Sequence, residues 1–265
     1  MSDWRSYDGV AEAYARVHAP RFAEPARDLV ALAAPAEDAR ILDVGTGTGV
    51  AASAAADAAT RGLVVGIDAS PAMLGQARVA RPDLPFVAAR AIDLPFRDGS
   101  FDLVVAGFVL AHFTKVETAL FDLRRVLRPG GRIAVSTWTG PRDELDATWR
   151  ALVAEVVPTD VLDGALASAI PWHDRFRVRS ALEEALIDDG FRHVRVEERE
   201  YRFRYTIDEY VDGLAALATG RFVRSMLGET SWATFLERVR ARFREGFADP
   251  LNDFRKVLLG VGTKP

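Results

Sequence analysis

The chain of 265 residues contains no cysteine and only four histidines. Without cysteine it can form neither disulfides nor thiolate metal sites, although this absence leaves the redox compartment undetermined. The histidines are scattered along the chain and form no H-E-x-x-H pattern, so we expect no metal site.

Long hydrophobic runs and a strong excess of charge are also lacking. The longest apolar run, residues 104–111, is too short to span a membrane, and residues 1–5 do not read as a signal segment. The formal net charge is −4, and no basic run is longer than a few residues, which argues against nucleic acid as a partner. We therefore expect a cytoplasmic protein without membrane insertion. The sequence leaves open whether it forms a homodimer.

The most informative segment is residues 40–49, with the sequence RILDVGTGTG. A short apolar run that ends in an acid and opens into alternating glycines is typical of a buried strand that turns beneath a ligand and continues as a helix. Glycine allows positive φ and has no Cβ atom to keep a ligand away from the main chain. The next ten residues, 50–59, are mostly alanine, so this helix can approach the sheet closely and present free N–H groups to the ligand.

The glycine spacing differs from that of phosphate-binding loops. The dinucleotide fingerprint G-x-G-x-x-G needs glycine at position 50, where this chain has Val50, and the pattern G-x-x-x-x-G-K-[ST] is absent. The order D-x-G-x-G-x-G suits a small-molecule cofactor without phosphate.

These residues resemble motif I of the class I S-adenosylmethionine-dependent methyltransferases. Residues 63–74 look like the family's second strand and following helix, and residues 89–105 resemble its DAxxLPFxDxSFDxVV stretch. The segment RRVLRPGGRIAVS is a further signature, and SYDGVAEAY resembles the start of the small-molecule branch, which includes quinone-biosynthesis and natural-product methyltransferases. Together the motifs of the core cover about residues 40–138.

The resemblance implies an α/β fold with a Rossmann-like, seven-stranded, mostly parallel sheet flanked by helices. It implies S-adenosyl-L-methionine as cofactor and methyl transfer by in-line displacement to O, N or C of a small-molecule acceptor. Two alternatives stay open. One is a noncatalytic sensor or scaffold that binds the cofactor with the same fold. The other is a nicotinamide-dependent oxidoreductase, which would need the missing glycine and a Tyr–Lys pair on one helix.

Asp68 closes the second expected strand, where a carboxylate can accept hydrogen bonds from both ribose hydroxyls. Its spacing from Gly45 would also suit a nicotinamide-binding fold, so this acid alone does not decide the cofactor. Ser70 and Pro71 read as N-cap and first residue of the next helix, which places Met73 on its first turn. In the family this position packs on the adenine; an ordinary core methionine would explain it as well.

Arg90 is the main departure from the family pattern. Many relatives have there an acid that accepts a hydrogen bond from the adenine amino group, whereas arginine only donates. We therefore expect adenine recognition by the backbone of Ala91 and Ile92, with an alternative register that gives the role of the acid to Asp93. The predicted cofactor-binding residues are Asp43, Gly45, Thr46, Gly47, Asp68, Ala69, Met73, Ala91, Ile92, Gly107 and Phe108.

His112 is the best-placed candidate for a general base, because it follows the strand end that in relatives faces the methyl acceptor. A structural role, in which its ring holds the loop by a backbone hydrogen bond, explains it equally well. Aromatic faces can stabilise a cationic centre, and the residues predicted to line the substrate pocket are Tyr7, Tyr14, Trp138 and Trp172. Each of these rings is also explained by packing.

We divide the chain into an N-terminal helical lid (1–36, carrying Trp4), a cofactor-binding core (37–140) and a substrate-side region that completes the sheet (141–265). Within the last region a capping box at residues 206–209 opens a helical insertion of about residues 206–250, which we expect to cap the acceptor pocket before the last strand. The alternation in residues 191–205 changes phase, which predicts a bulge or a bend near residues 198–200. The arginine-rich stretches at 175–179 and 238–244 read as solvated faces; binding of an anionic acceptor is the alternative.

Overall fold

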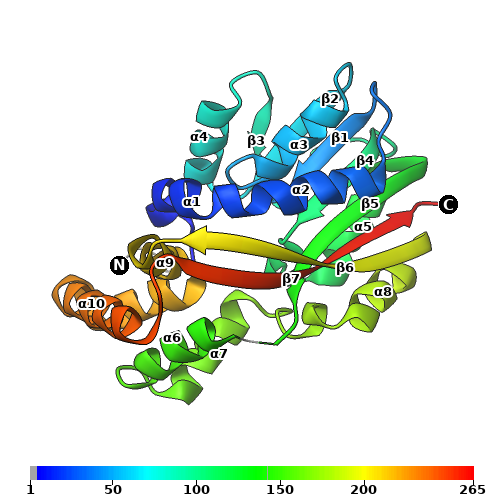
Figure 1. Cartoon of the computed structure of the whole chain (residues 1–265). Coiled ribbons are helices and arrows are strands. Elements are labelled where there is room, and N and C mark those ends of the chain that lie inside the picture. The colour runs from blue at the N-terminus through cyan, green and yellow to red at the C-terminus, as the bar shows by residue number, and fades with distance from the viewer. Residues whose placement is uncertain (1–4, 142) are drawn as a thin grey trace.

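The computed structural model describes residues 5–141 and 143–265, so Trp4 lies outside the described residues. Within them seven strands form one sheet in the order β3-β2-β1-β4-β5-β7-β6 (Figure 1). All neighbouring strands pair in parallel except β7, which is antiparallel to both β5 and β6. This confirms the expected mostly parallel, Rossmann-like sheet. The strands are β1 (Arg40–Val44), β2 (Leu63–Asp68), β3 (Phe86–Ala88), β4 (Phe101–Gly107), β5 (Leu127–Thr139), β6 (Arg192–Tyr205) and β7 (Leu251–Thr263).

Helices cover both faces of the sheet, and the side chains of each strand divide between the two faces. Ile41 of β1 belongs to the hydrophobic cluster that includes Leu29 of α2 (Ala19–Ala33) and Ala52 of α3 (Val50–Ala58). The next residue, Leu42, belongs to the cluster that includes residues of α5 (Val116–Val126) and α8 (Arg179–Asp188). Successive residues of a strand point to opposite faces, and helices bury both faces, so the sequence of each central strand is a continuous apolar run.

The carboxyl ends of β1, β2 and β4 meet at one edge of the sheet because these strands are parallel. The turn into α3, the start of α4 (Pro71–Ala80) and the short 3₁₀ helix η2 (Leu110–His112) all lie there. Ser70 is the N-cap of α4, and its hydroxyl accepts a hydrogen bond from the Met73 N–H at 3.1 Å. The predicted helix start is thereby confirmed.

The N-terminal segment lies over this edge. It forms the 3₁₀ helix η1 (Asp8–Val10) and α1 (Ala11–Val17), and both contact α4. On its other side α1 packs against α9 (Ile207–Ala216), which begins with the predicted capping box between Thr206 and Glu209. Figure 1 shows α9 gathered with α1 at one end of the long strands β6 and β7.

The remaining helices belong to residues 141–265, the region that we predicted to form the substrate side. They are α6 (Glu144–Ala154), α7 (Thr159–Ala169), the 3₁₀ helix η3 (Arg175–Arg177) and α10 (Ala218–Gly246). α10 contains a break at Gly228, where φ is 73°, and it contacts α6, α7 and α9. From the sequence we predicted only the second part of this helix, residues 231–246. The division into lid, core and cap remains a prediction.

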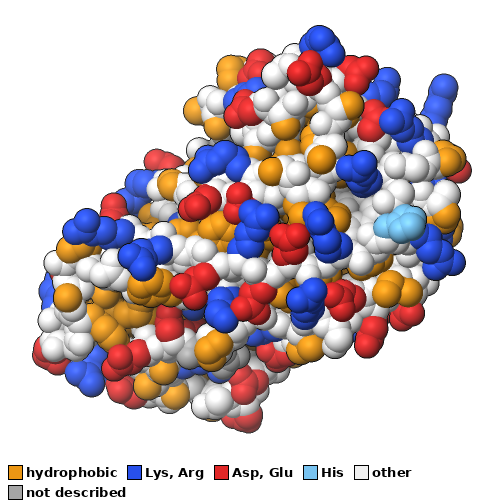
Figure 2. All heavy atoms as spheres, turned by 45° about the vertical axis from the view of Figure 1, so that its right-hand side comes forward, with side chains coloured by type: hydrophobic (Ala, Val, Ile, Leu, Met, Phe, Trp, Pro, Cys, Tyr) orange, Lys and Arg blue, Asp and Glu red, His pale blue; other side chains and the backbone are white. Residues whose placement is uncertain are grey.

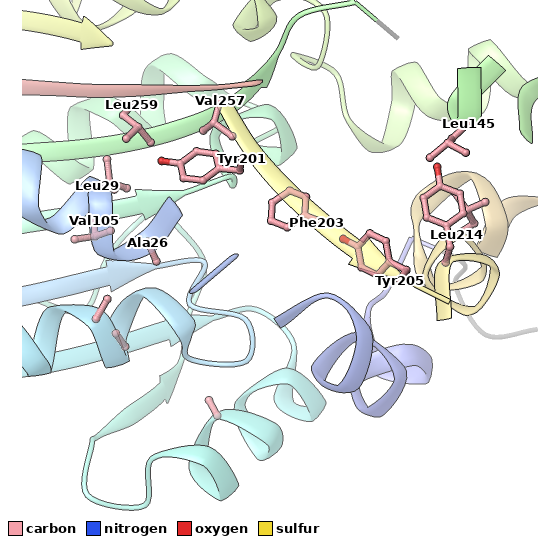
Figure 3. Packing of buried hydrophobic residues seen from close by; sticks show 14 of the residues in the cluster. Ala26, Leu29, Val105, Leu145, Tyr201, Phe203, Tyr205, Leu214, Val257 and Leu259 are labelled. Carbon is pink, nitrogen blue, oxygen red and sulfur yellow. The ribbon is translucent and has the colours of Figure 1, made fainter. Parts of the chain in front are cut away.

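Of the bulge or bend that we predicted near residues 198–200 of β6, the bulge is wrong. β6 pairs with β7 without a register shift from Arg195 to Tyr205, and the irregularity lies earlier, between Arg192 and Arg195. The phase of burial changes because the two halves of the strand bury opposite faces. Val196 packs into the cluster of α8, whereas Tyr201, Phe203 and Tyr205 point together into the other cluster (Figure 3).

The surface carries interspersed charges, as Figure 2 shows for one face. Along β6, for example, Arg199 pairs with Glu197 and Asp28. The arginines at positions 238, 240, 242 and 244 pair with acids, as expected for solvated faces. Among the described residues, no helix has both the length and the apolarity to cross a bilayer.

Candidate functional site

A cavity of about 350 Å³ opens at the carboxyl ends of β1, β2 and β4, beneath the N-terminal segment. It brings together every residue that the sequence predicts for cofactor binding, and also His112, Tyr7 and Tyr14. Trp138 and Trp172 are not among the lining residues. The lining is Tyr7, Tyr14, Phe22, Ala26, Leu29, Asp43, Val44, Gly45, Thr46, Gly47, Thr48, Val50, Ala51, Ile67, Asp68, Ala69, Met73, Ala89, Arg90, Ala91, Ile92, Gly107, Phe108, Val109, His112, Phe113, Thr114 and Ser136.

The glycine turn between β1 and α3 forms the floor of the cavity. Gly45 and Gly47 have φ values of 69° and 53°, a region that side chains rarely adopt. A Cβ atom on Gly45 would lie 2.3 Å from Cγ2 of Val109, so this position has no room for one. A Cβ atom on Gly47 would meet no atom nearer than 4.0 Å and would project into open space. The turn therefore leaves a bare stretch of main chain that fits a ligand lying flat against it.

Asp68 ends β2 with its carboxylate held against this turn. Its Oδ2 accepts a hydrogen bond from the Gly47 N–H and its Oδ1 one from the Ser70 N–H, each at 2.8 Å. Burial raises the pKa of the Asp68 carboxyl, and these backbone hydrogen bonds oppose that effect. Each carboxylate oxygen has a second lone pair, so the group can still accept hydrogen bonds from a vicinal diol.

Asp43, the last acid of β1, stabilises the turn from below. It is 1% exposed, and its Oδ2 accepts a hydrogen bond from the Thr46 hydroxyl at 2.6 Å. Burial raises the pKa of the Asp43 carboxyl to about 7.

Met73, Ala91 and Ile92 line the end of the cavity where the resemblance places the adenine. Met73 is 3% exposed. Arg90 is exposed and also lines the cavity, whereas Asp93, the alternative acid, does not. Recognition of the adenine by the backbone of Ala91 and Ile92 stays a prediction.

The lining also contains aromatic residues, among them Phe108. Phe108 has a φ of 56°, which is rare for a bulky residue and occurs where a site fixes the backbone. Its N–H donates to the carbonyl oxygen and the hydroxyl of Ser136, at 3.0 and 3.2 Å. Its ring lies 4.9 Å from the ring of Phe22 and 4.5 Å from that of Trp138. Trp138 therefore supports the wall of the cavity from behind.

His112 lines the cavity with its ring edge-on to Tyr7, at 6.1 Å between ring centroids. Burial lowers the pKa of His112 to about 4, and the positive charge of Arg221 acts in the same direction. The imidazole is therefore neutral at physiological pH, and this low pKa makes it a weak proton acceptor. Whether it acts as a base or holds the loop remains open, as does the assignment of Trp172, which lies against Phe176 away from the lining.

Asp8 is a residue of this region that sequence reasoning missed. Its Oδ1 accepts hydrogen bonds from the Ser70 hydroxyl at 2.5 Å and from the Ala72 N–H at 3.3 Å. It thereby fastens the N-terminal segment to the first turn of α4, next to Asp68. Phe22, Val109 and Ser136 were also missed. For Phe22 the available signal was that aromatic residues follow one another at Tyr7, Tyr14 on α1 and Phe22 on α2.

Comparison with known proteins finds a match between residues 42–135 and the family described as "Methyltransferase domain". A malonyl-[acyl-carrier protein] O-methyltransferase of Geobacter sulfurreducens is 32% identical over 237 residues, which cover 86% of this chain and 85% of that protein. A demethylmenaquinone methyltransferase of Beutenbergia cavernae is 43% identical over 157 residues, which cover 55% and 64% of the two chains. The chain spans about half of the length of the first demethylmenaquinone methyltransferases that it matches.

The fold has solved counterparts. One is phosphoethanolamine N-methyltransferase 2 of Haemonchus contortus in complex with S-adenosyl-L-methionine, with a TM-score of 0.59 at 17% identity. The superposition covers all of this chain and 60% of that protein. Another is the [4+2]-cyclase SpnF, with a TM-score of 0.56 at 21% identity, over 91% of this chain and 81% of that one. At this level of identity the likeness concerns the fold alone.

Proposed function

This chain belongs to the class I S-adenosylmethionine-dependent methyltransferases, and we propose that it transfers the methyl group of S-adenosylmethionine to a small-molecule acceptor bound beside the aromatic residues of the cavity. Its relatives named above act on demethylmenaquinone and on malonyl-[acyl-carrier protein]. These acceptors differ in chemistry, so the acceptor of this chain has to be sought in its own residues.

The observation that supports the proposal best is that one cavity is lined by two chemically different sets of residues. The bare turn at Gly47 and the carboxylate of Asp68 suit a nucleoside without phosphate. Phe108, Tyr7 and Tyr14 suit an apolar or aromatic acceptor. A group transfer needs both partners in one space shielded from water.

S-adenosylmethionine, when bound, supplies a methyl group activated by its sulfonium. In the proposed mechanism Asp68 holds the ribose hydroxyls and the backbone of Ala91 and Ile92 holds the adenine. Phe108 and the rings of the N-terminal segment exclude water and orient the acceptor for in-line attack. His112, which is neutral, takes the proton of an acceptor that arrives protonated.

Calorimetry with S-adenosylhomocysteine tests the cofactor assignment. Replacing Asp68 by Ala should weaken binding by about 1–3 kcal/mol, because its buried hydrogen bonds to the ribose are lost. Asp57→Ala is the matched control, since Asp57 is 76% exposed and lies outside the lining. An unchanged affinity of Asp68→Ala would remove the role given to this carboxylate, and no binding by the unmodified protein would contradict the proposal.

A screen of small acceptors with isotopically labelled methyl donor distinguishes the enzyme from a scaffold that only binds the cofactor. The enzyme transfers label to at least one acceptor class and releases S-adenosylhomocysteine repeatedly. A scaffold binds the donor stoichiometrically and transfers nothing.

A further inference from the structure

A buried group of charged side chains ties the start of α2 to β7, and the proposed cofactor contacts do not use it. Its centre is Asp253, whose side chain is 0% exposed. One carboxylate oxygen of Asp253 accepts a hydrogen bond from Nη2 of Arg21 at 3.0 Å, and the other lies 2.7 Å from Nε of Arg255. A carboxylate shut off from water is stable only beside such partners, so Asp253 requires both guanidinium groups where they are.

The guanidinium of Arg21 is held from a second side by β6. Its central carbon lies 5.3 Å from the ring centroid of Phe203 and 4.8 Å from that of Tyr205. Figure 3 shows these two rings following one another along β6. Arg21 is therefore fixed by two strands of the sheet, although it belongs to α2.

Arg21 in turn fixes the imidazole of His18, the residue between α1 and α2. Nη1 of Arg21 lies 3.3 Å from Nδ1 of His18, and Nε2 of the same ring lies 2.9 Å from the carbonyl oxygen of Gly213 in α9. A guanidinium only donates and a carbonyl only accepts, so Nδ1 is the acceptor and Nε2 carries the proton. The neutral ring thereby links α2 to α9.

α9 can approach this junction because residue 213 is glycine. A Cβ atom at Gly213 would lie 3.1 Å from Cγ1 of Val17 and 3.2 Å from Cε1 of His18. Both distances are shorter than the optimal separation of carbon atoms. The residue types at this crossing therefore allow the hydrogen bond between His18 and α9.

The junction carries two rings of the cavity wall, one on each helix. Tyr14 of α1 and Phe22 of α2 both line the cavity, and their rings are stacked, with centroids 6.1 Å and planes 12° apart. The ring of Tyr14 lies 4.9 Å from that of His18, and the ring of Phe22 lies 4.9 Å from that of Phe108. Phe22 directly follows Arg21 in the chain. A movement of α2 relative to α1 would therefore separate the two rings.

We propose that Arg21 and Asp253 are positioning residues for ligand binding. They hold the junction of α1 and α2 in one arrangement, and this arrangement places the rings of Tyr14 and Phe22 on the cavity wall. The inference rests on the proposed function and deepens it, because it names groups that shape the binding site from outside its lining.

Net stability alone does not explain a buried ion pair, because the cost of removing both charges from water offsets their attraction. Apolar side chains of similar volume often give an equally stable protein. The contacts of the ion pair are directional, however, and they fix the place where α2 begins. A pair that serves only folding can therefore be replaced by apolar residues without loss of binding, whereas a positioning pair cannot.

Calorimetry with S-adenosylhomocysteine compares Arg21→Met/Asp253→Leu with the unmodified protein, and urea unfolding shows whether the variant is folded. Arg255 keeps an acidic partner in this variant, because Asp143 lies 3.3 Å away. We expect a folded protein whose affinity is lower by on the order of tenfold. An affinity within about twofold of that of the unmodified protein overturns the proposal.

Arg199→Met/Asp28→Leu is the matched control. Arg199 of β6 lies 2.9 Å from Asp28 of α2, so this pair also ties α2 to the sheet, and neither residue lines the cavity. The control should bind S-adenosylhomocysteine as the unmodified protein does. A loss as large as that of the first variant would contradict the special role of the junction.

A double-mutant cycle tests whether the pair acts through the rings. Phe22→Ala removes the ring that depends on the junction, so adding Arg21→Met and Asp253→Leu to it should lower the affinity by no more than about twofold. An undiminished further loss overturns the proposal, because the pair would then act by another route.

Arg21→Lys keeps the test open if the double variant does not fold. It keeps a cation beside Asp253 but replaces the guanidinium fork by a point charge that cannot reproduce both contacts of Arg21. We expect an affinity a few-fold below that of the unmodified protein, in line with a partial rescue. An unchanged affinity of a folded Arg21→Lys protein overturns the proposal.

A second measurement needs no ligand. NOE contacts between the ring protons of Tyr14 and Phe22 should be present in the unmodified protein and in the control, and weaker or absent in Arg21→Met/Asp253→Leu or, if that variant does not fold, in Arg21→Lys. Equal contacts in all these proteins contradict the positioning role. Failure of the proposed function is a different result, namely that the unmodified protein itself does not bind S-adenosylhomocysteine.

Discussion

Replacing Gly47 by Ala should weaken cofactor binding in addition to a modest loss of folding stability. Gly47 has a φ of 53°, and an alanine held in the left-handed region costs about 1–2 kcal/mol of stability. Within the protein the new Cβ atom has room, since its nearest neighbour would lie 4.0 Å away. The space that it enters is the cavity itself, where a flat ligand would rest on the main chain.

Gly130→Ala provides a matched comparison. Gly130 has a φ of 75°, a Cβ atom there would meet nothing within 4 Å, and the residue lies outside the cavity lining. Both substitutions therefore carry the same backbone strain and no steric clash. They differ only in whether the added methyl group faces the ligand.

Guanidinium unfolding measures the shared loss of stability, and calorimetry with S-adenosylhomocysteine measures binding. We expect similar losses of about 1–2 kcal/mol in unfolding free energy for both variants. We expect Gly47→Ala alone to lose at least about 1.4 kcal/mol of binding free energy, which is tenfold in affinity. Equal affinities of the two variants would refute the reasoning that the ligand lies on this turn.

Two further predictions concern the N-terminal segment and the effect of pH. Asp8→Ala removes the hydrogen bonds to Ser70 and Ala72. Release of S-adenosylhomocysteine, measured by stopped flow, should become several-fold faster, which corresponds to the loss of about 1 kcal/mol for a helix-capping contact. Glu12→Ala replaces an exposed residue of α1 and should leave the release rate unchanged. Burial, and then the charge of Arg21, lower the pKa of His18 to about 4. The unfolded chain protonates His18 near its usual pKa of 6.5, so the folded state loses stability relative to the unfolded state as the pH falls from 6.5 to 4. In urea unfolding, the difference in unfolding free energy between the unmodified protein and His18→Gln should therefore shrink by about 3 kcal/mol over this range. A difference that does not change with pH would contradict this.

The cofactor end of the site was predictable from sequence because its signals are local. The glycine turn, Asp68 at the end of a strand and the Ser70 N-cap each occupy a few consecutive residues whose conformations follow from residue type. Parallel pairing of β1 and β2 then brings these segments together at one edge of the sheet. The mostly parallel character of the sheet was expected from the resemblance to the methyltransferase family.

The acceptor end was only partly predictable because it is assembled from distant segments. Asp8 meets Ser70 across 62 positions of sequence, and no local pattern records that contact. Arg221 lies in the first turn of α10, and its guanidinium stacks on the ring of Tyr7, which is distant in the sequence. Trp138 is a residue type that often lines pockets, yet its ring lies behind that of Phe108. In β6 the alternation was visible, but which half buries which face depends on the helices that cover the sheet.

The most direct test of the account is a crystal structure with S-adenosylhomocysteine bound. We predict that the nucleoside lies on the main chain at Gly45 and Gly47, with both ribose hydroxyls within hydrogen-bonding distance of the Asp68 carboxylate and the sulfur directed toward Phe108. A ligand bound elsewhere, or a ribose that does not contact Asp68, would contradict the account.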